Sequence, residues 1–291
     1  MTLAKTSAAL GSLIEDIRER KQEVNFVSQE FADEFTIAPG RITVLGAPPG
    51  AGKTCLASQL AFSALESFPT LNLIVANAEM DIQAILRREI SRRSGIAHKR
   101  ILEARFDDAE FELLLTTCSD LAKLTPRVRH MVTPFSVQAL GELLELPPGL
   151  LVCDYIQKFR SPERDVRSGV DEVVGCLRSV AMHGWAILAI SALARPQGGY
   201  GSKETSLSSF RDSSGIEYEA DLCYLLEDQS KDQHARVKEL TLRCVKNRSG
   251  FMSSTSLVFC GDYMRFERRD PVRHAELDDF NSGGFVTGFP E

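Results

Sequence analysis

One glycine-rich segment constrains the fold of this chain more than any other. Residues 47–54 read Ala-Pro-Pro-Gly-Ala-Gly-Lys-Thr and lie between the apolar run Ile42–Leu45 and a helical pattern near 54–67. This is the phosphate-loop pattern GxxxxGK[ST], with alanine at the first glycine position. Such a loop requires a strand to end and a helix to begin at one point, because backbone N–H groups at the helix N-terminus surround the phosphates. The segment therefore predicts the strand–loop–helix unit of a nucleotide-binding domain.

The loop also suggests roles for individual residues. The Lys53 ammonium is expected to reach the β- and γ-phosphates, and the Thr54 hydroxyl is a candidate Mg²⁺ ligand. Pro48 and Pro49 have no N–H group, so they must occupy early loop positions where no phosphate donor is needed. The residues predicted to contact the nucleotide here are Pro49, Gly50, Ala51, Gly52, Lys53, Thr54 and Cys55.

Apolar runs recur along the chain and alternate with helical patterns. Nearly continuous apolar runs are typical of central parallel strands covered on both faces. The runs that predict these strands are Ile42–Leu45, Leu71–Ala76, Leu150–Cys153 and Ala186–Ile190. The helical patterns lie near residues 54–67, 81–94, 107–124, 136–146 and 168–183.

Later runs complete the predicted sheet. Strand-like segments occur at Leu222–Leu226, Leu240–Val245 and Ser256–Cys260, the last followed by a hairpin into Tyr263–Phe266. We expect these to be antiparallel edge strands. The fold class is therefore α/β, with a mostly parallel central sheet, helices on both faces and antiparallel strands at one edge.

The chain is expected to consist of an arm, one domain and a tail. Residues 1–24 form an amphipathic N-terminal arm, with apolar residues at helical spacing between 10 and 17. Two interpretations of the arm remain open: it packs on its own domain, or it docks on a neighbouring subunit. The domain spans residues 25–267, and residues 268–291 are expected to be a flexible tail.

Composition narrows the class of protein. The 291 residues include 34 Lys or Arg and 40 Asp or Glu, a net charge of −6, which argues against a uniformly basic surface. A basic stripe inside a ring or groove remains compatible with that total. The basic run Arg87–Arg100 is interpreted as a solvated helix face. No apolar run approaches the ~20 residues of a membrane-spanning helix, and no signal peptide is recognised, so we expect a cytoplasmic protein.

Two carboxylates follow predicted strands and are candidate site residues. Asp154 ends the apolar run Leu150–Cys153, about a hundred residues after the phosphate loop, where it can orient a water on Mg²⁺. Glu79 follows the strand after the loop's helix and can polarise a water for attack on the γ-phosphate. An alternative for Glu79 is a carboxylate favoured by the dipole of the following helix.

Taken in order, these motifs resemble the RecA-like motor domain of DnaB-type replicative helicases. The resemblance covers residues 41–267 and adds Gln157, in Asp-Tyr-x-Gln, to the predicted nucleotide-binding residues. The segments that carry it are Ala47–Thr54, Glu79-Met80, Asp154–Gln157, Ser191–Arg195, Arg211–Asp221, Lys246–Gly250 and Tyr263–Phe266.

The resemblance implies an ATP-dependent DNA helicase or translocase that uses ATP and Mg²⁺ and works as a hexameric ring. In such a ring Glu79 is the catalytic carboxylate, while Lys246 and Arg248 reach the ATP site of a neighbouring subunit. The loops 158–168 and 196–212 would face the central channel. The candidate contacts to single-stranded DNA are Arg195, Lys203 and Arg211. An alternative for Arg211 is an internal ion pair with Glu217 or Asp221.

The sequence also departs from the family pattern. The family's Ser-Gln-Leu-Asn-Arg segment is here Ser191-Ala-Leu-Ala-Arg195, so Ala192 removes an amide that would sense the γ-phosphate. Only about 24 residues precede the domain, and we expect a stand-alone motor without the family's N-terminal domain. These departures favour an alternative function: a RecA-like ATPase that acts as a nucleotide-driven switch or assembly platform without unwinding activity, of a mobile-element, defence or signalling type.

Overall fold

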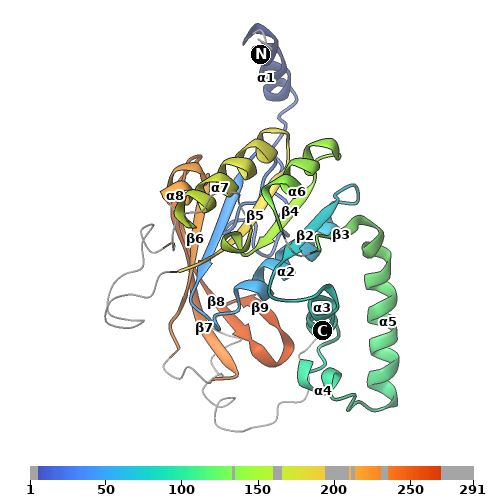
Figure 1. Ribbon diagram of the computed structural model, residues 1–291. Helices are drawn as coiled ribbons and strands as arrows, with labels where there is room; N and C mark the ends of the chain where they lie inside the picture. The colour runs from blue at the N-terminus through green and yellow to red at the C-terminus, as the bar shows by residue number, and fades with distance from the viewer. Residues whose placement is uncertain are drawn as a thin grey trace.

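The computed structural model describes residues 6–132, 135–159, 166–193, 210, 214–230 and 235–269. In this part of the chain one nine-stranded sheet has the order β3-β2-β4-β5-β1-β6-β7-β8-β9 (Figure 1). The strands are β1 (Ile42–Ala47), β2 (Leu73–Asn77), β3 (Val128–His130), β4 (Leu150–Asp154), β5 (Ala186–Ala192), β6 (Leu222–Asp228), β7 (Val237–Asn247), β8 (Ser254–Cys260) and β9 (Arg265–Arg268). The run from β3 to β6 pairs in parallel, and β7, β8 and β9 add in antiparallel fashion, which confirms the predicted fold class.

Helices cover both faces of the sheet (Figure 1). Ile42 and Val44 of β1 pack in an apolar cluster with helices α6 and α7, whereas Leu45 packs in a second cluster with α2 and α3. Because both faces are covered, the central strands β1 and β4 are buried at every position instead of alternating between buried and exposed residues. The helices are α1 (Thr6–Arg18), α2 (Lys53–Ser67), α3 (Ile82–Ser94), α4 (His98–Leu102), α5 (Asp108–Leu124), α6 (Val137–Gly141), α7 (Val166–Met182) and α8 (Ser214–Glu219).

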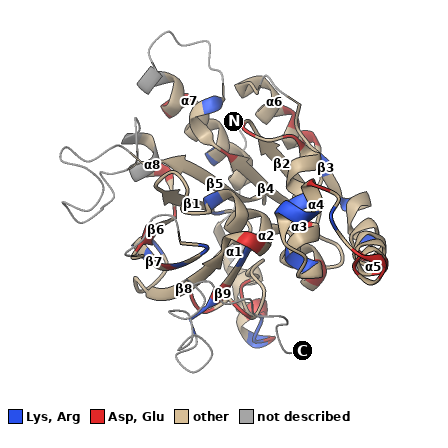
Figure 2. Ribbon diagram, turned by 90° about the horizontal axis from the view of Figure 1, so that it is seen from below, with Lys and Arg blue, Asp and Glu red and all other residues tan. Residues whose placement is uncertain are grey.

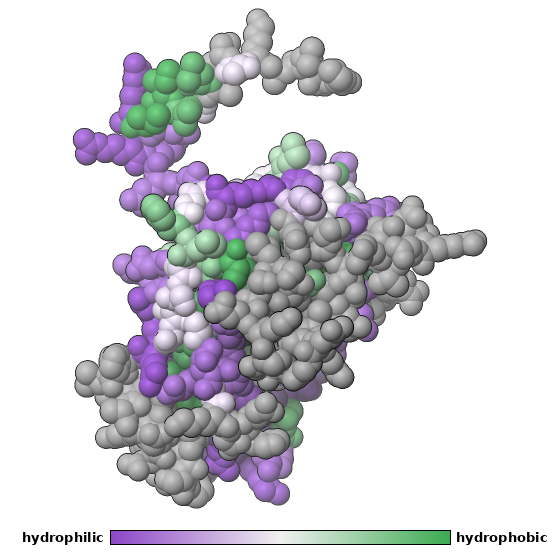
Figure 3. All heavy atoms as spheres, turned by 90° about the vertical axis from the view of Figure 1, so that its left-hand side faces the viewer, coloured by the Kyte–Doolittle hydropathy of each residue, from purple (hydrophilic) through white to green (hydrophobic). Residues whose placement is uncertain are grey.

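Helix α1 projects away from the domain (Figure 1). Its apolar side chains Leu10, Leu13, Ile14 and Ile17 are between 40% and 66% exposed and form an apolar patch on the projecting helix (Figure 3). This exposure contradicts packing of the arm on its own domain. Docking on a neighbouring subunit stays a prediction. Among the described residues, no helix is both long and apolar enough to cross a bilayer.

The structure corrects several local expectations. The pattern near 136–146 is not one helix, because α6 ends at Gly141 and a 3₁₀ turn follows at Glu142–Glu145. Strand β3 and helices α4 and α8 were not predicted, since three to six residues are too few for a periodic pattern.

The basic run after β2 is not simply a solvated face. Lys and Arg gather on α3 and α4 (Figure 2), but the Arg92 and Arg93 side chains are only 14% and 13% exposed. Both pair with Glu89, whose side chain is 1% exposed, at 2.5 Å and 2.6 Å. A buried carboxylate requires such partners, so part of the run serves the packing of α3.

Candidate active site

The phosphate loop joins β1 to α2. Gly50 and Gly52 have φ angles of +79° and +82°, in the left-handed region that glycine adopts without strain. A Cβ atom at Gly52 would also lie 2.8 Å from Cζ of Phe266. Backbone conformation and space therefore both require glycine at position 52. Because the first N–H groups of an α-helix have no intrahelical partner, the start of α2 is able to bind phosphate.

Strand β9 packs against helix α2, which begins at the phosphate loop. Gln59 of α2 donates to the Phe266 carbonyl at 2.8 Å and accepts from the Phe266 N–H at 2.9 Å. The Cys55 side chain is buried, with its Sγ 3.7 Å from Met264 Sδ, and burial raises the pKa of its thiol. The side chain of Cys55 is thus buried in packing contacts. The predicted contact of Cys55 with the nucleotide would therefore be made by its backbone N–H.

Asp154 lies at the carboxyl end of β4 and is 1% exposed. Its Oδ2 accepts hydrogen bonds from the Thr54 hydroxyl at 2.6 Å and from Asn77 Nδ2 at 3.0 Å. Its Oδ1 is buried and has no hydrogen-bond partner among the described residues. Burial raises the pKa of the Asp154 carboxyl, opposed by the Thr54 hydrogen bond and the Lys53 charge. An unpartnered carboxylate oxygen beside a hydroxyl is an oxygen donor set that suits Mg²⁺.

Asn77 connects Asp154 to Glu79. It ends β2 directly opposite Asp154 in the sheet register. Its Oδ1 accepts the backbone N–H groups of Glu79 at 2.9 Å and Met80 at 2.8 Å, which fixes the turn after the strand. The Glu79 side chain is exposed and borders a cavity of about 340 Å³. The predicted carboxylates Asp154 and Glu79 thus lie at the ends of neighbouring strands, at the edge of the sheet formed by the carboxyl ends of the parallel strands. Glu79 is accessible to water.

Gln157 lies just after β4, in a 3₁₀ turn (Ile156–Lys158). Its Nε2 donates to the Ser191 hydroxyl at 2.9 Å, so the turn is attached to the carboxyl end of β5. Ala192, the next residue, offers a methyl group where the family pattern has an amide. The structure therefore brings Gln157 to the same edge as Asp154, while its contact with nucleotide stays a prediction.

Lys246 and Arg248 lie at the opposite edge of the sheet, the one formed by the amino ends of the parallel strands. Register pairs Lys246 with Cys223, at the amino end of β6, whereas the phosphate loop follows the carboxyl end of β1. Arg248 Nη1 donates to Asp221 Oδ1 at 3.3 Å, and Arg248 Nη2 donates to the Tyr218 carbonyl. Lys246 Nζ donates to the same carbonyl at 3.3 Å, and burial together with the Arg248 charge lowers the pKa of Lys246. Neither cation is near the phosphate loop of its own chain.

The candidate DNA contacts Arg195, Lys203 and Arg211 lie outside the described residues. Asp221 was one alternative partner for Arg211, and its described ion-pair partners are Arg178 and Arg248.

Comparison with known proteins identifies the domain. The family model described as DnaB-like helicase C terminal domain matches residues 14–268. The chain belongs to this family.

Relatives and solved structures agree with this assignment. The replicative DNA helicase DnaB of Leifsonia xyli subsp. xyli is 27% identical over 254 residues, 82% of this chain and 55% of that protein. The replicative DNA helicase DnaC of Bacillus subtilis is 22% identical over 275 residues, 88% of this chain and 60% of that protein. This DnaB-like helicase C-terminal domain thus spans a little over half the length of these curated relatives.

Two solved structures share the fold. The ATPase domain of G40P has a TM-score of 0.79 at 18% identity, with 92% of this chain and 100% of that chain covered. A DnaB-like replicative helicase, studied with its interactions with primase, has a TM-score of 0.74 at 18% identity, with 92% and 68% covered.

Sequence reasoning missed two groups of residues in this DnaB-like domain. Asn77 stands in the motif Val75-Ala-Asn-Ala-Glu79, and its position two residues before the carboxylate was a usable signal for a turn-forming side chain. Lys238 donates to the Gly50 carbonyl at 3.3 Å, and Arg178 contacts Asp221 at 2.8 Å. Both of these basic residues come from elements remote in sequence, and no local signal indicates them.

Proposed function

We propose that this chain is the motor of an ATP-dependent DNA helicase or translocase that hydrolyses MgATP between the subunits of a homo-hexameric ring. The observation that carries the proposal is the position of Arg248 and Lys246 at the opposite edge of the sheet from the phosphate loop. The six residues of β1 alone separate the two edges by about 20 Å. A cation at that distance can serve only the ATP of another subunit, and a closed ring supplies one to every site.

Each residue of the ATP site has a distinct part in this reaction. The N–H groups at the start of α2 and the Lys53 ammonium bind the phosphates and neutralise their charge. Glu79 accepts a proton from the attacking water, for which its exposed carboxylate is suited. Arg248 and Lys246 of the adjacent subunit neutralise the charge that develops on the transferred phosphoryl group.

Thr54 and Asp154 are the residues that would hold Mg²⁺. When bound there, Mg²⁺ would supply positive charge that offsets the negative charge of the phosphates. The unpartnered Oδ1 of Asp154 supports this assignment, because a buried carboxylate oxygen otherwise lacks any compensation.

The proposed DNA contacts all follow β5 in the chain and lie outside the described residues. Arg195, Lys203 and Arg211 would bind phosphates of single-stranded DNA in a channel, a contact that is independent of base sequence and sensitive to salt. We further propose that α1 docks its exposed apolar face on the neighbouring subunit, since burying that face would stabilise the ring.

A second function is favoured by Ala192. Without an amide at the end of β5, the γ-phosphate has one fewer polar group through which to move the DNA-facing loop. A nucleotide-driven switch or assembly platform would tolerate this change, because it needs ATP turnover without coupled movement on DNA.

One experiment separates the two functions. The ATPase rate is measured with and without single-stranded DNA, together with the mass in solution in MgATP, with Lys53→Ala as the blank. A ring-sized particle with DNA-stimulated turnover supports the motor. A smaller particle whose turnover ignores DNA overturns it and supports the switch.

A further inference from the structure

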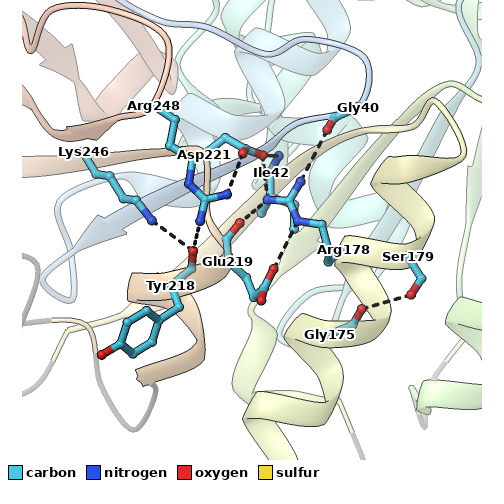
Figure 4. A network of polar contacts seen from close by, with 10 residues as sticks. All are labelled: Gly40, Ile42, Gly175, Arg178, Ser179, Tyr218, Glu219, Asp221, Lys246 and Arg248. Atoms are coloured by element: carbon cyan, nitrogen blue, oxygen red, sulfur yellow. Dashed lines mark hydrogen bonds and ion pairs between the residues drawn. The ribbon is translucent and has the colours of Figure 1, made fainter. Parts of the chain in front are cut away.

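Asp221 organises the edge of the sheet that carries Arg248. It lies just before β6, is 9% exposed, and its Oδ2 accepts the backbone N–H of Ile42 at 2.8 Å. The same oxygen accepts from Arg178 Nη2 at 2.8 Å, while Oδ1 accepts from Arg248 Nη1 at 3.3 Å (Figure 4). The Asp221 carbonyl also accepts the backbone N–H of Arg248 at 3.0 Å. Both the backbone and the guanidinium of Arg248 are therefore positioned by this one residue.

Arg178 enters this network from helix α7. Its side chain is 19% exposed and forms ion pairs with Asp221 and with Glu219 Oε2, the latter at 3.3 Å. It also donates to the Glu219 carbonyl, so it ties α7 to the end of α8 and the start of β6 (Figure 4). A planar guanidinium can make these contacts at once, which the point charge of a lysine cannot.

The geometry leaves Arg248 held but accessible. Its side chain is 48% exposed, and two of the five N–H donors of a guanidinium are accounted for by Asp221 and the Tyr218 carbonyl. The remaining donors are able to meet a phosphate oxygen without breaking the contact with Asp221. An arginine fixed in advance avoids the cost of ordering a long side chain at the moment of reaction.

We propose that Arg178 is a positioning residue for hydrolysis in the neighbouring subunit: by holding Asp221 from α7, it orients the guanidinium of Arg248 toward that subunit's ATP. This inference rests on the proposed function, because it requires Arg248 to act between subunits. Arg178 itself contacts neither nucleotide nor phosphate in this arrangement.

The test uses Arg178→Gln and Arg178→Lys in the full chain, with kcat and KM for ATP measured in the presence of Mg²⁺. We expect kcat of the Gln variant to fall about 10- to 100-fold, the range for a misplaced catalytic group, with KM nearly unchanged because the variant's own ATP site is at the other edge. The Lys variant should lose less, since it keeps the charge without the planar fork. If the Gln variant does not fold, the Lys variant alone tests whether Arg178 is a positioning residue.

Mixing subunits distinguishes positioning from general damage. Lys53→Ala subunits keep an intact Arg248, and Arg178→Gln subunits keep an intact ATP site, so mixed rings should hydrolyse ATP faster than the sum of the two separate preparations. Damage to the variant's own site would not be repaired by mixing. The matched control is Glu219→Gln, which removes an exposed partner of Arg178 but leaves Asp221 paired, and its kcat should stay within about two-fold of the parent.

The outcomes separate this inference from the proposed function. If Arg248→Ala is not rescued by Lys53→Ala subunits, hydrolysis between subunits is wrong and both fail. If Arg248→Ala is rescued but both Arg178 variants keep the parental kcat, or lose it without rescue on mixing, only the positioning role is overturned.

Discussion

Asp154 and Asp221 are both buried aspartates at the ends of strands, but at opposite edges of the sheet. Asp221 pairs with two arginines and a backbone N–H, so its charge is compensated within the chain. Asp154 accepts hydrogen bonds only from neutral donors among the described residues, and its Oδ1 has no such partner. Burial correspondingly raises the pKa of Asp154.

This difference is the one expected between a structural carboxylate, Asp221, and the proposed metal-binding carboxylate, Asp154. A buried charge without a partner costs folding free energy, so it persists where a bound cation supplies the compensation. The proposed Mg²⁺ would supply that compensation at the edge with Asp154. At the edge with Asp221 the carboxylate is paired within the chain, and the Arg248 side chain is accessible to solvent.

The largest effects are expected from removing the cations at the two edges, Lys53 and Arg248. Lys53→Ala and Arg248→Ala should each lower the hydrolysis rate about 10³-fold or more, because each removes a charge that stabilises the transition state. Only Lys53→Ala should weaken ATP binding to dissociated subunits, measured with a fluorescent nucleotide. Equal loss of binding in Arg248→Ala would mean that both edges serve one site, and the comparison would fail.

Glu79→Gln tests the proposed catalytic role of Glu79. We expect hydrolysis to fall by about 10²- to 10⁴-fold with ATP binding retained, since the amide cannot accept a proton from water. The melting temperature should not change, because Glu79 is exposed. Asp81→Asn is the matched control: it alters a carboxylate two residues away, and asparagine still caps α3. Similar losses in both variants would contradict a specific role for Glu79.

The two aspartates should respond oppositely to the same substitution. Asp221→Asn should lower the free energy of unfolding by about 2 kcal/mol, because it removes the charge of a carboxylate that accepts hydrogen bonds from Arg178, Arg248 and the Ile42 N–H. In the presence of a chelator, Asp154→Asn should raise it by about 1 kcal/mol, because it removes an uncompensated buried charge. Urea titrations of both variants measure this. A loss of stability in both would show that Asp154 is structural as well.

The pH dependence of stability sharpens the same point. The folded-state pKa of Asp154 is raised, so the folded chain holds this proton more tightly than the unfolded chain. Its stabilising contribution is therefore complete below the unfolded pKa and is lost as pH rises through the folded pKa. Thermal melts in chelator from about pH 4 to pH 7 should show this slope in the parent and not in Asp154→Asn. Mg²⁺ should offset the loss at neutral pH in the parent alone.

The smallest effect on the fold is expected from α1. Replacing Leu13 and Ile17 by serine should change the free energy of unfolding by less than about 0.5 kcal/mol, because both side chains are exposed. The same change should weaken self-association, measured by light scattering in MgATP. Glu15→Ser on this helix is the control. Unchanged assembly would remove α1 from the proposed subunit contact.

The fold and the candidate site residues at the edge with the phosphate loop were predictable from local patterns. The strand before the phosphate loop, the helix after it and the parallel runs follow from continuous apolar segments, and Asp154 and Glu79 follow from their places after strands. Short elements such as β3 and α8 were not predictable, because they depend on neighbours already in the sheet. The basic run on α3 was misread. The spacing of Arg92 and Arg93 from Glu89 indicates ion pairs along a helix, but only the packing of α3 shows that Glu89 is buried.

The sequence by itself determined the nucleotide loop, the α/β class and the carboxylates beside the loop, because each depends on residues adjacent in the chain. Only the tertiary structure decided that Asn77 joins Asp154 to Glu79, that Lys238 reaches Gly50, and that Arg178 and Arg248 share Asp221. The physical reason is that strand order and register set which distant side chains meet. Of these contacts, the pairs of Arg178 and Arg248 with Asp221 compensate charges that the sequence shows only as scattered residues.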